Sequence, residues 1–230
     1  MRKALLPITA VIISASAMSQ TVLITQDFES FDPGDPLAQS AGLPWTTWSN
    51  APGGVEDTEV TDTLAHGGNM SAVFESTAAN GGPTDVILQL GNRTAGQYLL
   101  GWWMRIPAGK GGYFNIQKSI TPGQSWSIDV IFRASGAIEL STNASAGATT
   151  SYPVDQWFLV GMSFDLDASA ATLTIDGNTA ATWVTTTAVG TGGVGLNQIG
   201  AVNFYGYSGG DQSAYYIDDL SFVDISGVGV

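Results

Sequence analysis

Acidic side chains gather near the two ends of the chain, in Asp27-Phe28-Glu29 and in Tyr216-Ile217-Asp218-Asp219-Leu220. Both runs adjoin alternating apolar residues of the kind that form β-strands. If the first and last strands pair, the carboxylates of the two runs meet at one edge of a sheet, where a hard cation such as calcium could neutralise them through oxygen ligands. The alternative is that these acids face solvent on edge strands and discourage aggregation.

A catalytic constellation is not recognisable in the sequence. The chain has no cysteine and one histidine, His66, which excludes thiol chemistry and multi-histidine metal sites within one chain. His66 precedes the turn Gly67-Gly68-Asn69, where a histidine makes local hydrogen bonds more often than it acts as a general base. Glycosidases need two carboxyl groups flanking the scissile bond, and Glu56-Asp57-Thr58-Glu59 has the wrong spacing and lies in an expected loop.

The first 19 residues have the pattern of an export signal, with Arg2 and Lys3 followed by an apolar run and then small residues. The run is too short to span a membrane, so we expect no membrane insertion. Cleavage after Ser19, or alternatively after Ala17, would release a secreted protein. We therefore expect an extracellular or cell-surface location.

The net charge is −13, with only seven lysine and arginine residues. A duplex-binding protein needs clustered basic residues to displace counterions, so this composition argues against a nucleic-acid partner. An anionic membrane surface would repel the chain for the same reason. The acidity is compatible with cation binding and equally with a hydrated surface.

Short strand patterns separated by glycine-rich and asparagine-rich turns predict an all-β chain, and no long helical period competes with them. About 210 residues after the leader are ample for one β-sandwich core. We expect a single domain over residues 20–225, followed at 226–230 by the start of a Gly-rich tail or linker. The expected strands are 22–30, 44–49, 70–76, 84–90, 96–106, 112–119, 124–133, 136–142, 156–166, 169–176, 179–185, 197–206 and 214–224.

Period-two alternation divides the central strands into a core side and an outer side. It places Trp126 with the core residues of its strand. If the central strands are neighbours, their outer residues form one polar face with aromatic platforms, which suits a sugar because C–H groups stack on rings while hydroxyls need paired donors and acceptors. The alternative is that the aromatic members pack under a loop or a second layer. The expected ligand-binding residues are Trp103, Arg105, Asn115, Gln117, Asp129, Asn203 and Tyr205.

The ordered set of strand and turn motifs resembles the concanavalin A-like lectin/glucanase superfamily, which includes laminin-G-like and carbohydrate-binding domains. The resemblance implies a jelly-roll β-sandwich of two antiparallel sheets. It is carried by Gln26-Asp27-Phe28-Glu29, Ala65-His66-Gly67-Gly68-Asn69-Met70-Ser71, Trp157-Phe158-Leu159-Val160, Phe164-Asp165-Leu166-Asp167, Ala171-Thr172-Leu173-Thr174-Ile175-Asp176-Gly177 and Tyr216-Ile217-Asp218-Asp219-Leu220-Ser221-Phe222.

The resemblance also implies a structural calcium ion held by Glu29, Asp219 and oxygens of the His-Gly-Gly turn, with Asp27 and Asp218 as further ligands or supporting neighbours. The glucanase pattern Glu-x-Asp-x-x-Glu of this superfamily is missing here. Three further segments look like a group of secreted bacterial surface proteins that often carry a type IX sorting domain, which this chain lacks. These segments are Trp45-Thr46-Thr47-Trp48-Ser49-Asn50, Gly111-Gly112-Tyr113-Phe114-Asn115 and Ala201-Val202-Asn203-Phe204-Tyr205.

These observations predict a secreted, non-catalytic carbohydrate-binding or adhesive surface module that uses a concave sheet face and contains structural calcium. Its expected partner is a polysaccharide or glycan, with possible protein contacts at the cell surface. A polysaccharide-degrading hydrolase or lyase of the same fold is one alternative. A structural subunit of an extracellular layer or filament is another, although we expect a monomeric or weakly associating chain.

Overall fold

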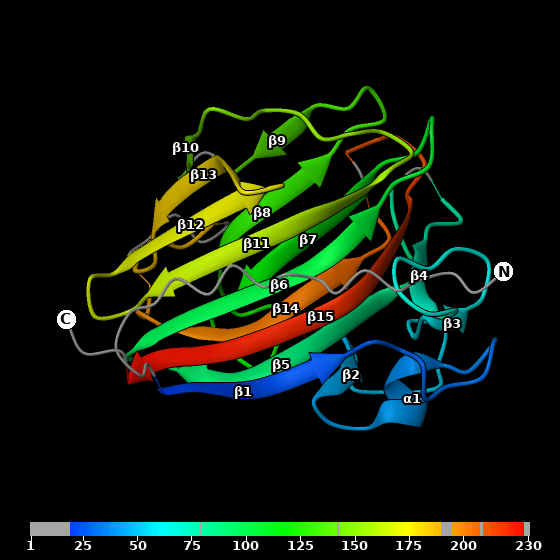
Figure 1. Ribbon diagram of the computed structural model, residues 1–230, viewed down its shortest axis with the longest axis horizontal. Coiled ribbons are helices and arrows are strands. Elements are labelled where there is room, and N and C mark those ends of the chain that lie inside the picture. Colours follow the sequence, from blue (N-terminus) through cyan, green and yellow to red (C-terminus); the bar gives the residue numbers. More distant parts are fainter. Residues whose placement is uncertain (1–18, 79, 142, 190–194, 208, 228–230) are drawn as a thin grey trace, which may run out of the picture.

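Two antiparallel sheets contain nearly all of the regular structure and lie face to face (Figure 1). This computed structural model describes residues 19–227 except 79, 142, 190–194 and 208. Most of the predicted leader and the last three residues of the predicted tail lie outside the described residues. Within the described part of the chain, no helix is long and apolar enough to cross a membrane.

The nine-stranded sheet forms the front layer in Figure 1. Its strands, in spatial order, are β10 (Ser145–Ala146), β13 (Asn178–Val184), β12 (Ala170–Ile175), β11 (Trp157–Asp165), β6 (Gln97–Arg105), β15 (Ala214–Gly227), β4 (Ser71–Glu75) and β3 (Glu59–Thr61), with β1 (Ser19–Gln26) paired to β15.

The six-stranded sheet forms the layer behind it. Its strands, in spatial order, are β2 (Trp45–Thr47), β5 (Asp85–Arg93), β14 (Ile199–Tyr205), β7 (Gly112–Gln117), β8 (Trp126–Phe132) and β9 (Ile138–Leu140). A short helix, α1 (Leu37–Ala41), precedes β2.

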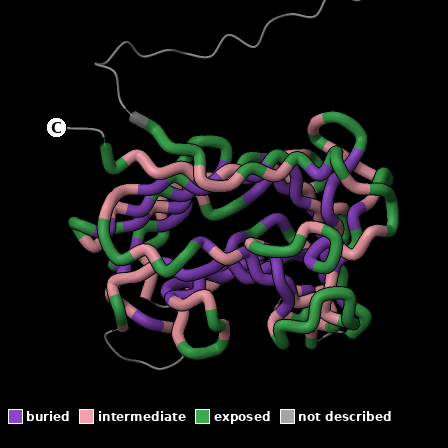
Figure 2. Tube along the Cα trace, turned by 90° about the horizontal axis from the view of Figure 1, so that it is seen from below, coloured by how far each residue is buried: buried purple, intermediate pink, exposed green. Residues whose placement is uncertain are grey.

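Large aromatic side chains fill the space between the sheets. Figure 2 shows buried residues along the inner sides of both layers. Trp102 of β6 is fully buried and packs edge-on against Phe114 of β7 and Phe204 of β14, with ring centroids 5.0 and 5.1 Å apart. Such contacts combine a large buried apolar area with favourable ring geometry. The core therefore joins β6 of one sheet to β7 and β14 of the other.

The longest strand, β15, has different neighbours along its length. One side pairs with β6, whereas the other pairs with β4 as far as Ile217 and with β1 from Leu220 onward. The register with β6 shifts between Asp218 and Ser221, and Asp219 has a φ of 49°, a left-handed conformation that aspartate adopts more readily than most residues. The first and last strands thus pair as expected. At Asp218 and Asp219, β15 changes its neighbour on this side from β4 to β1, and we call this point the handover.

The turn of residues 66–70 is held at this handover by acids from both ends of the chain. Glu29, just after β1, accepts hydrogen bonds at Oε1 from the N–H groups of Asn69 (2.9 Å) and Met70 (2.7 Å). Both bonds lower the pKa of Glu29, and the bond from Asn69 has the larger effect. Gly68 lies against the Glu29 carboxylate with a φ of 58°, so a side chain there would be both strained and blocked.

The opposite side of the same turn is bound by the last strand. Asp218 is fully buried, and its Oδ2 accepts hydrogen bonds from the N–H groups of His66 (2.8 Å) and Gly67 (3.1 Å). Burial raises the pKa of Asp218, and the hydrogen bonds from Gly67 and His66 act in the opposite direction. Asp219 contacts the His66 ring at 2.7 Å between Oδ2 and Nδ1. We call Glu29, Asp218, Asp219 and the turn of residues 66–70 the acidic clamp.

The sandwich of two antiparallel sheets confirms the fold expected from the sequence, and every expected strand range overlaps an observed strand. Three short elements were not expected: α1, β3 and β10. The sequence placed Glu59, the first residue of β3, in a loop.

Removing the buried acid of the clamp should destabilise the fold. We expect Asp218→Ala to lower the free energy of unfolding by about 2 kcal/mol, because the N–H groups of His66 and Gly67 lose their buried acceptor. Urea denaturation measures the difference. Asp27→Ala is the matched control: this exposed acid accepts one local bond, from the N–H of Glu29 at 3.2 Å, so its change should stay within about 0.5 kcal/mol. Equal effects of the two substitutions would contradict the clamp.

Candidate functional site

The outer side of the six-stranded sheet carries polar residues at the middle of its central strands. Along β7, Phe114 and Ile116 belong to the core, so Tyr113, Asn115 and Gln117 point to the other side of the sheet. The same alternation on β14 places Asn203 beside Asn115, its direct cross-strand partner. Sequence reasoning had selected Asn115, Gln117 and Asn203, and the structure brings these three together.

Asn115, Gln117 and Asn203, the amide cluster, are buried and hydrogen-bonded to one another. The Nδ2 of Asn115 donates to Oδ1 of Asn203 at 3.1 Å and to the Tyr113 hydroxyl at 2.9 Å. The Nε2 of Gln117 donates to Oδ1 of Asn115 at 2.6 Å, and the N–H of Gly123 donates to Oε1 of Gln117 at 3.0 Å. Because buried polar groups are costly unless paired, this network fixes the orientation of each amide.

A carboxylate lies at each end of the amide cluster. Asp85, at the start of β5, accepts a 2.6 Å hydrogen bond at Oδ1 from Nδ2 of Asn203. Asp129 of β8 accepts one from the Tyr113 hydroxyl at 2.5 Å and another from Nε1 of Trp126 at 2.9 Å. The hydrogen-bonded row therefore runs across four adjacent strands, from β5 through β14 and β7 to β8.

Burial changes the acidity of this row. It raises the pKa of Asp85 to about 7, against the lowering effect of the Asn203 hydrogen bond, and the charge of Glu56 adds to the rise. Burial also raises the pKa of the Tyr113 hydroxyl, and the nearby charge of Asp129 acts in the same direction. Tyr113 therefore stays a neutral donor, while Asp85 holds a proton over much of the range below neutral pH.

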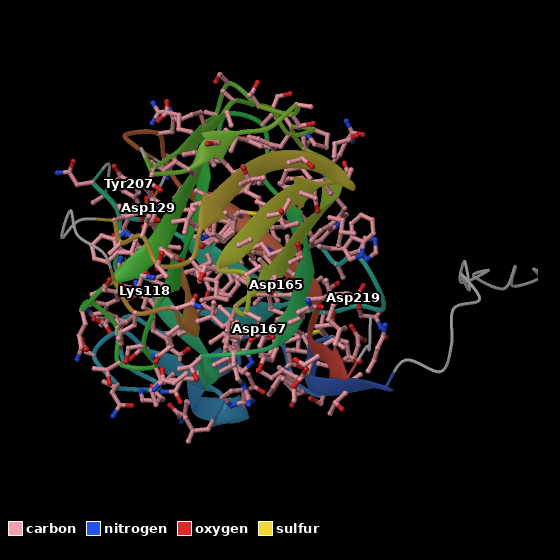
Figure 3. The ribbon with its side chains drawn as sticks, turned by 90° about the vertical axis from the view of Figure 1, so that its left-hand side faces the viewer. Lys118, Asp129, Asp165, Asp167, Tyr207 and Asp219 are labelled. Carbon is pink, nitrogen blue, oxygen red and sulfur yellow. The ribbon has the colours of Figure 1, made fainter. Side chains whose placement is uncertain are left out.

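Three tyrosines form a wall beside the row. Tyr205 and Tyr207 stack with ring centroids 6.0 Å apart and an interplanar angle of 14°, and Tyr113 meets both rings edge-on. Tyr205 and Tyr207 are half-buried, which leaves part of each ring accessible. In Figure 3, Asp129 and Tyr207 lie together on one side of the sandwich and Asp219 of the acidic clamp lies on the opposite side.

The expectation that Trp126 faces the core is wrong. The pairing of β7 with β8 shifts register between Ile116 and Gln117, so that Gln117 lies opposite Trp126. Ser127 is buried at this irregularity, and its hydroxyl faces the carbonyl of Ile116. One extra residue in a strand reverses the alternation beyond it, which turns the half-buried Trp126 toward Asp129 on the outer side.

The expectation of one common face is also wrong for Trp103 and Arg105. Both belong to β6 in the nine-stranded sheet and have no strand neighbour among β7, β8 and β14. Trp103 stacks on His66 with centroids 3.9 Å apart, and Arg105 binds Asp155 at 2.9 Å. Alternation identified which side of each strand is polar, but the chain crosses from one sheet to the other between β6 and β7. Of the selected residues, Asn115, Gln117, Asp129, Asn203 and Tyr205 remain together.

Lys118 lies directly after β7 but has other partners. Its side chain is buried, and Nζ donates to the carbonyl oxygens of Leu196 (2.7 Å) and Thr185. Burial lowers the pKa of Lys118 to about 8. It therefore anchors these two segments to β7 and does not present a cation to the outer face.

The residues selected as calcium ligands lie in or next to the acidic clamp, on the opposite side of the molecule. No group of three or more histidine or acidic side chains converges there or elsewhere among the described residues. Glu29 and Asp219 do approach the backbone of Gly67 and Gly68 from two sides. A calcium ion at this point would therefore need oxygen ligands besides Glu29 and Asp219, which water can supply.

Sequence reasoning missed Asp85, Tyr113 and Trp126. Tyr113 has the same alternation as Asn115 and Gln117, so the pattern itself could have identified it. Asp85 is the first residue of its strand, where an aspartate is typical of a turn. The bulge that exposes Trp126 leaves no signal in the sequence.

No protein-family model matches the chain, and the search of curated proteins finds no match. Solved structures do share its fold. "Cellulose induced protein, Cip1" is 16% identical with a TM-score of 0.55, and the alignment covers 86% of this chain and 96% of that one. An endo-1,3-beta-glucanase from Streptomyces sioyaensis is 13% identical with a TM-score of 0.52, covering 93% and 100%.

A third similar structure is domain 4 of AbnA, a GH43 extracellular arabinanase from Geobacillus stearothermophilus, in complex with arabinotriose. It is 18% identical with a TM-score of 0.51, and the alignment covers 90% of this chain and 94% of that domain. The alignment with a sialidase covers 82% of this chain but only 18% of the sialidase chain. At these identities the comparisons establish the fold, a jelly-roll β-sandwich.

Asp85 should give the fold a pH dependence. Its pKa is raised from 3.8 to about 7, so its contribution to stability is present at low pH and is lost as the pH rises through 7. Asp85→Asn keeps an oxygen for Asn203 and removes the titration. Between about pH 5 and about pH 8, we expect the free energy of unfolding of the native chain to fall by on the order of 2 kcal/mol more than that of Asp85→Asn. Urea denaturation at several pH values measures this, and parallel profiles would contradict a protonated Asp85.

Proposed function

We propose that this protein is a secreted, non-catalytic module that binds a neutral glycan on the outer face of the six-stranded sheet. The observation that carries this proposal is the row of hydrogen-bonded amides and carboxylates across four strands, next to accessible tyrosine rings. The buried amides satisfy one another, so the half-buried carboxyl groups and rings around them are the groups that can meet a ligand.

The chemistry of the row suits sugar hydroxyls. Asp85 and Asp129 each present carboxyl oxygens, and a carboxylate can accept hydrogen bonds at several positions. The amide cluster behind them is oriented by its own bonds, so little ordering is required when a ligand binds. The half-buried rings of Tyr205, Tyr207 and Trp126 offer surfaces on which the C–H face of a pyranose or furanose can stack.

The charge on this side of the molecule favours a neutral glycan. The net charge of the chain is −13, with Asp129 ionised in the row and Asp85 joining it as the pH rises through about 7. An anionic polysaccharide would therefore be repelled at short range. Lys118, the nearest buried cation, is held by carbonyl oxygens. We therefore expect uncharged polysaccharides to bind in preference to uronates or sulfated chains.

The similar structures are compatible with this proposal. One of them is a domain solved with arabinotriose, part of an extracellular enzyme, and another is an endo-1,3-beta-glucanase. This support is an analogy at the level of the fold, which by itself does not transfer a ligand. The export signal expected from the sequence agrees with an extracellular polysaccharide as the partner.

Polysaccharide cleavage is the second candidate, and Asp85 is the observation that favours it. A carboxyl group whose pKa is raised to about 7 by burial is suited to donate a proton to a glycosidic oxygen. Asp85 shares the face with Asp129, although three strand spacings separate their strands. Binding ranks first because the two carboxyl groups are joined by a rigid amide row instead of flanking a gap.

Glycan binding should depend on the tyrosine wall. We expect the native protein to bind at least one of insoluble cellulose, β-1,3-glucan and arabinan in pull-down assays, and Tyr205→Ala to raise the dissociation constant about tenfold by removing a stacking surface. Trp103→Ala is the matched control, because this aromatic residue lies on the other sheet and its loss should leave binding unchanged. Retained binding in Tyr205→Ala, or no binding to a wider panel of neutral glycans, would contradict the proposal. Release of reducing sugar that disappears in Asp85→Asn would support the second candidate instead.

We also propose structural calcium at the acidic clamp, with Glu29 and Asp219 supplying carboxylate oxygens beside the turn of residues 66–70. An ion bound there only in the folded state raises stability. We expect a chelator to lower the melting temperature of the secreted protein and excess calcium, but not magnesium, to restore it. An unchanged melting temperature after chelation would rule out calcium and leave the clamp held by hydrogen bonds alone.

A further inference from the structure

Strand β1 forms an open edge of the nine-stranded sheet. It pairs with β15 on one side, and no described strand pairs with its other side. Figure 1 shows β1 along the lower border of the front sheet, with no strand of that sheet beyond it. An edge of this kind presents unpaired N–H and C=O groups that can bind another strand.

The sequence of β1 lacks the features that protect edges. Its eight residues, SQTVLITQ, include no charged residue, no proline and no glycine, although the chain as a whole is strongly acidic. Its pairing with β15 is irregular at two places, between Ser19 and Thr21 and between Val22 and Ile24, and these bulges are the one edge-protecting feature of the strand. The side chain of Val22 is 60% exposed. Natural proteins usually place lysine or proline on such an edge to prevent association.

The same strand is nearly a palindrome. Reading outward from Leu23, the residue types on the two sides are valine and isoleucine, then threonine twice, then glutamine twice. If two copies pair antiparallel with Leu23 opposite Leu23, then Val22 lies opposite Ile24 and Thr21 lies opposite Thr25. Like pairs of β-branched residues and of threonines are favourable cross-strand neighbours. A palindromic strand therefore matches itself in one antiparallel register.

A pocket with mainly apolar walls opens beside this edge, and the polar residues of its lining are Thr25, Gln89 and Arg93. Its volume is about 550 Å³, and it reaches two core residues, Leu90 and Phe222. Leu23 and Ile24 of β1 line one wall and Leu43, which is 75% exposed, lines another. A second copy placed against β1 would cover this apolar surface, which a monomer leaves in contact with water.

We propose that β1 is a self-association surface, on which a second copy of this chain pairs antiparallel in the register that centres on Leu23. The interface is isologous, since the same strand contributes from both copies, and it closes at two chains. It also joins the two nine-stranded sheets into one continuous sheet. The proposal does not depend on glycan binding, because the amide cluster and the tyrosine wall lie on the other sheet.

The register can be tested with charges at Thr21 and Thr25, which are both exposed. In the proposed dimer, Thr21→Lys with Thr25→Lys brings new lysines of the two copies opposite each other twice. Thr21→Lys with Thr25→Glu instead places each new lysine opposite a new glutamate. The two double variants change the same positions, so differences between them report the pairing and not the folding of β1.

The experiment is sedimentation velocity on the protein secreted from its full-length chain, at concentrations up to about 100 µM. We expect the native protein to dimerise, the double lysine variant to raise the dissociation constant at least about tenfold, and the lysine–glutamate variant to recover native association. Circular dichroism melting verifies that both variants are folded.

Three results would overturn the proposal. The first is a native protein that stays monomeric across this range, and native mass spectrometry of that monomer would show whether a small apolar molecule occupies the pocket instead. The second is a dimer that the double lysine variant leaves intact, which would place the interface elsewhere. The third is growth beyond two chains, since pairing of β1 with itself ends at the dimer.

Discussion

The handover on β15 from β4 to β1 is the constraint on which the rest of this fold depends. One strand pairs with two others in succession along the same side, and the step between them requires the left-handed Asp219 and the buried Asp218. Both acids bind the turn of residues 66–70, which Glu29 holds from the other end of the chain. The N–H groups of this turn donate hydrogen bonds to the carboxylates of Glu29 and Asp218. These bonds offset the repulsion between acidic side chains that lie close together. The same handover leaves β1 as the border of the sheet.

The hydrophobic core connects the nine-stranded sheet to the six-stranded sheet. Trp102 of β6, the strand beside β15, packs on Phe114 and Phe204, so a fully buried ring positions β7 and β14 against β6. Asn115 and Asn203 are the sequence neighbours of Phe114 and Phe204, and they point to the other side of the sheet. A rigid hydrophobic side thus fixes the geometry of the polar side, which is what a binding surface needs if its donors and acceptors are to meet a ligand without reorganisation.

Alternation predicted the strands and most of the outer face, because each depends only on neighbours in sequence. It gave Asn115, Gln117, Asp129, Asn203 and Tyr205 correctly as residues on the side away from the core. It could not decide which strands share a sheet, and for that reason it joined Trp103 and Arg105 to a face from which the core separates them. It also could not find the bulge at Ser127, since an extra residue in one strand is defined by its partner. The pKa of Asp85 depends on burial by segments distant in sequence and was equally out of reach.

The proposed dimer through β1 fixes how the two proposed glycan-binding faces are oriented relative to each other. An antiparallel pair of identical strands is related by a twofold axis perpendicular to the sheet, so both copies place their six-stranded sheets on the same side of the joined sheet. The two tyrosine walls then point in one direction, away from the interface. A polysaccharide surface offers many equivalent sites, and two linked modules bind it more tightly than one by a factor of roughly 10² to 10⁴ without any new contact. Weak recognition by the tyrosine wall and the carboxyl groups beside it would in this way become firmer attachment, and self-pairing of β1 would need an edge without charges.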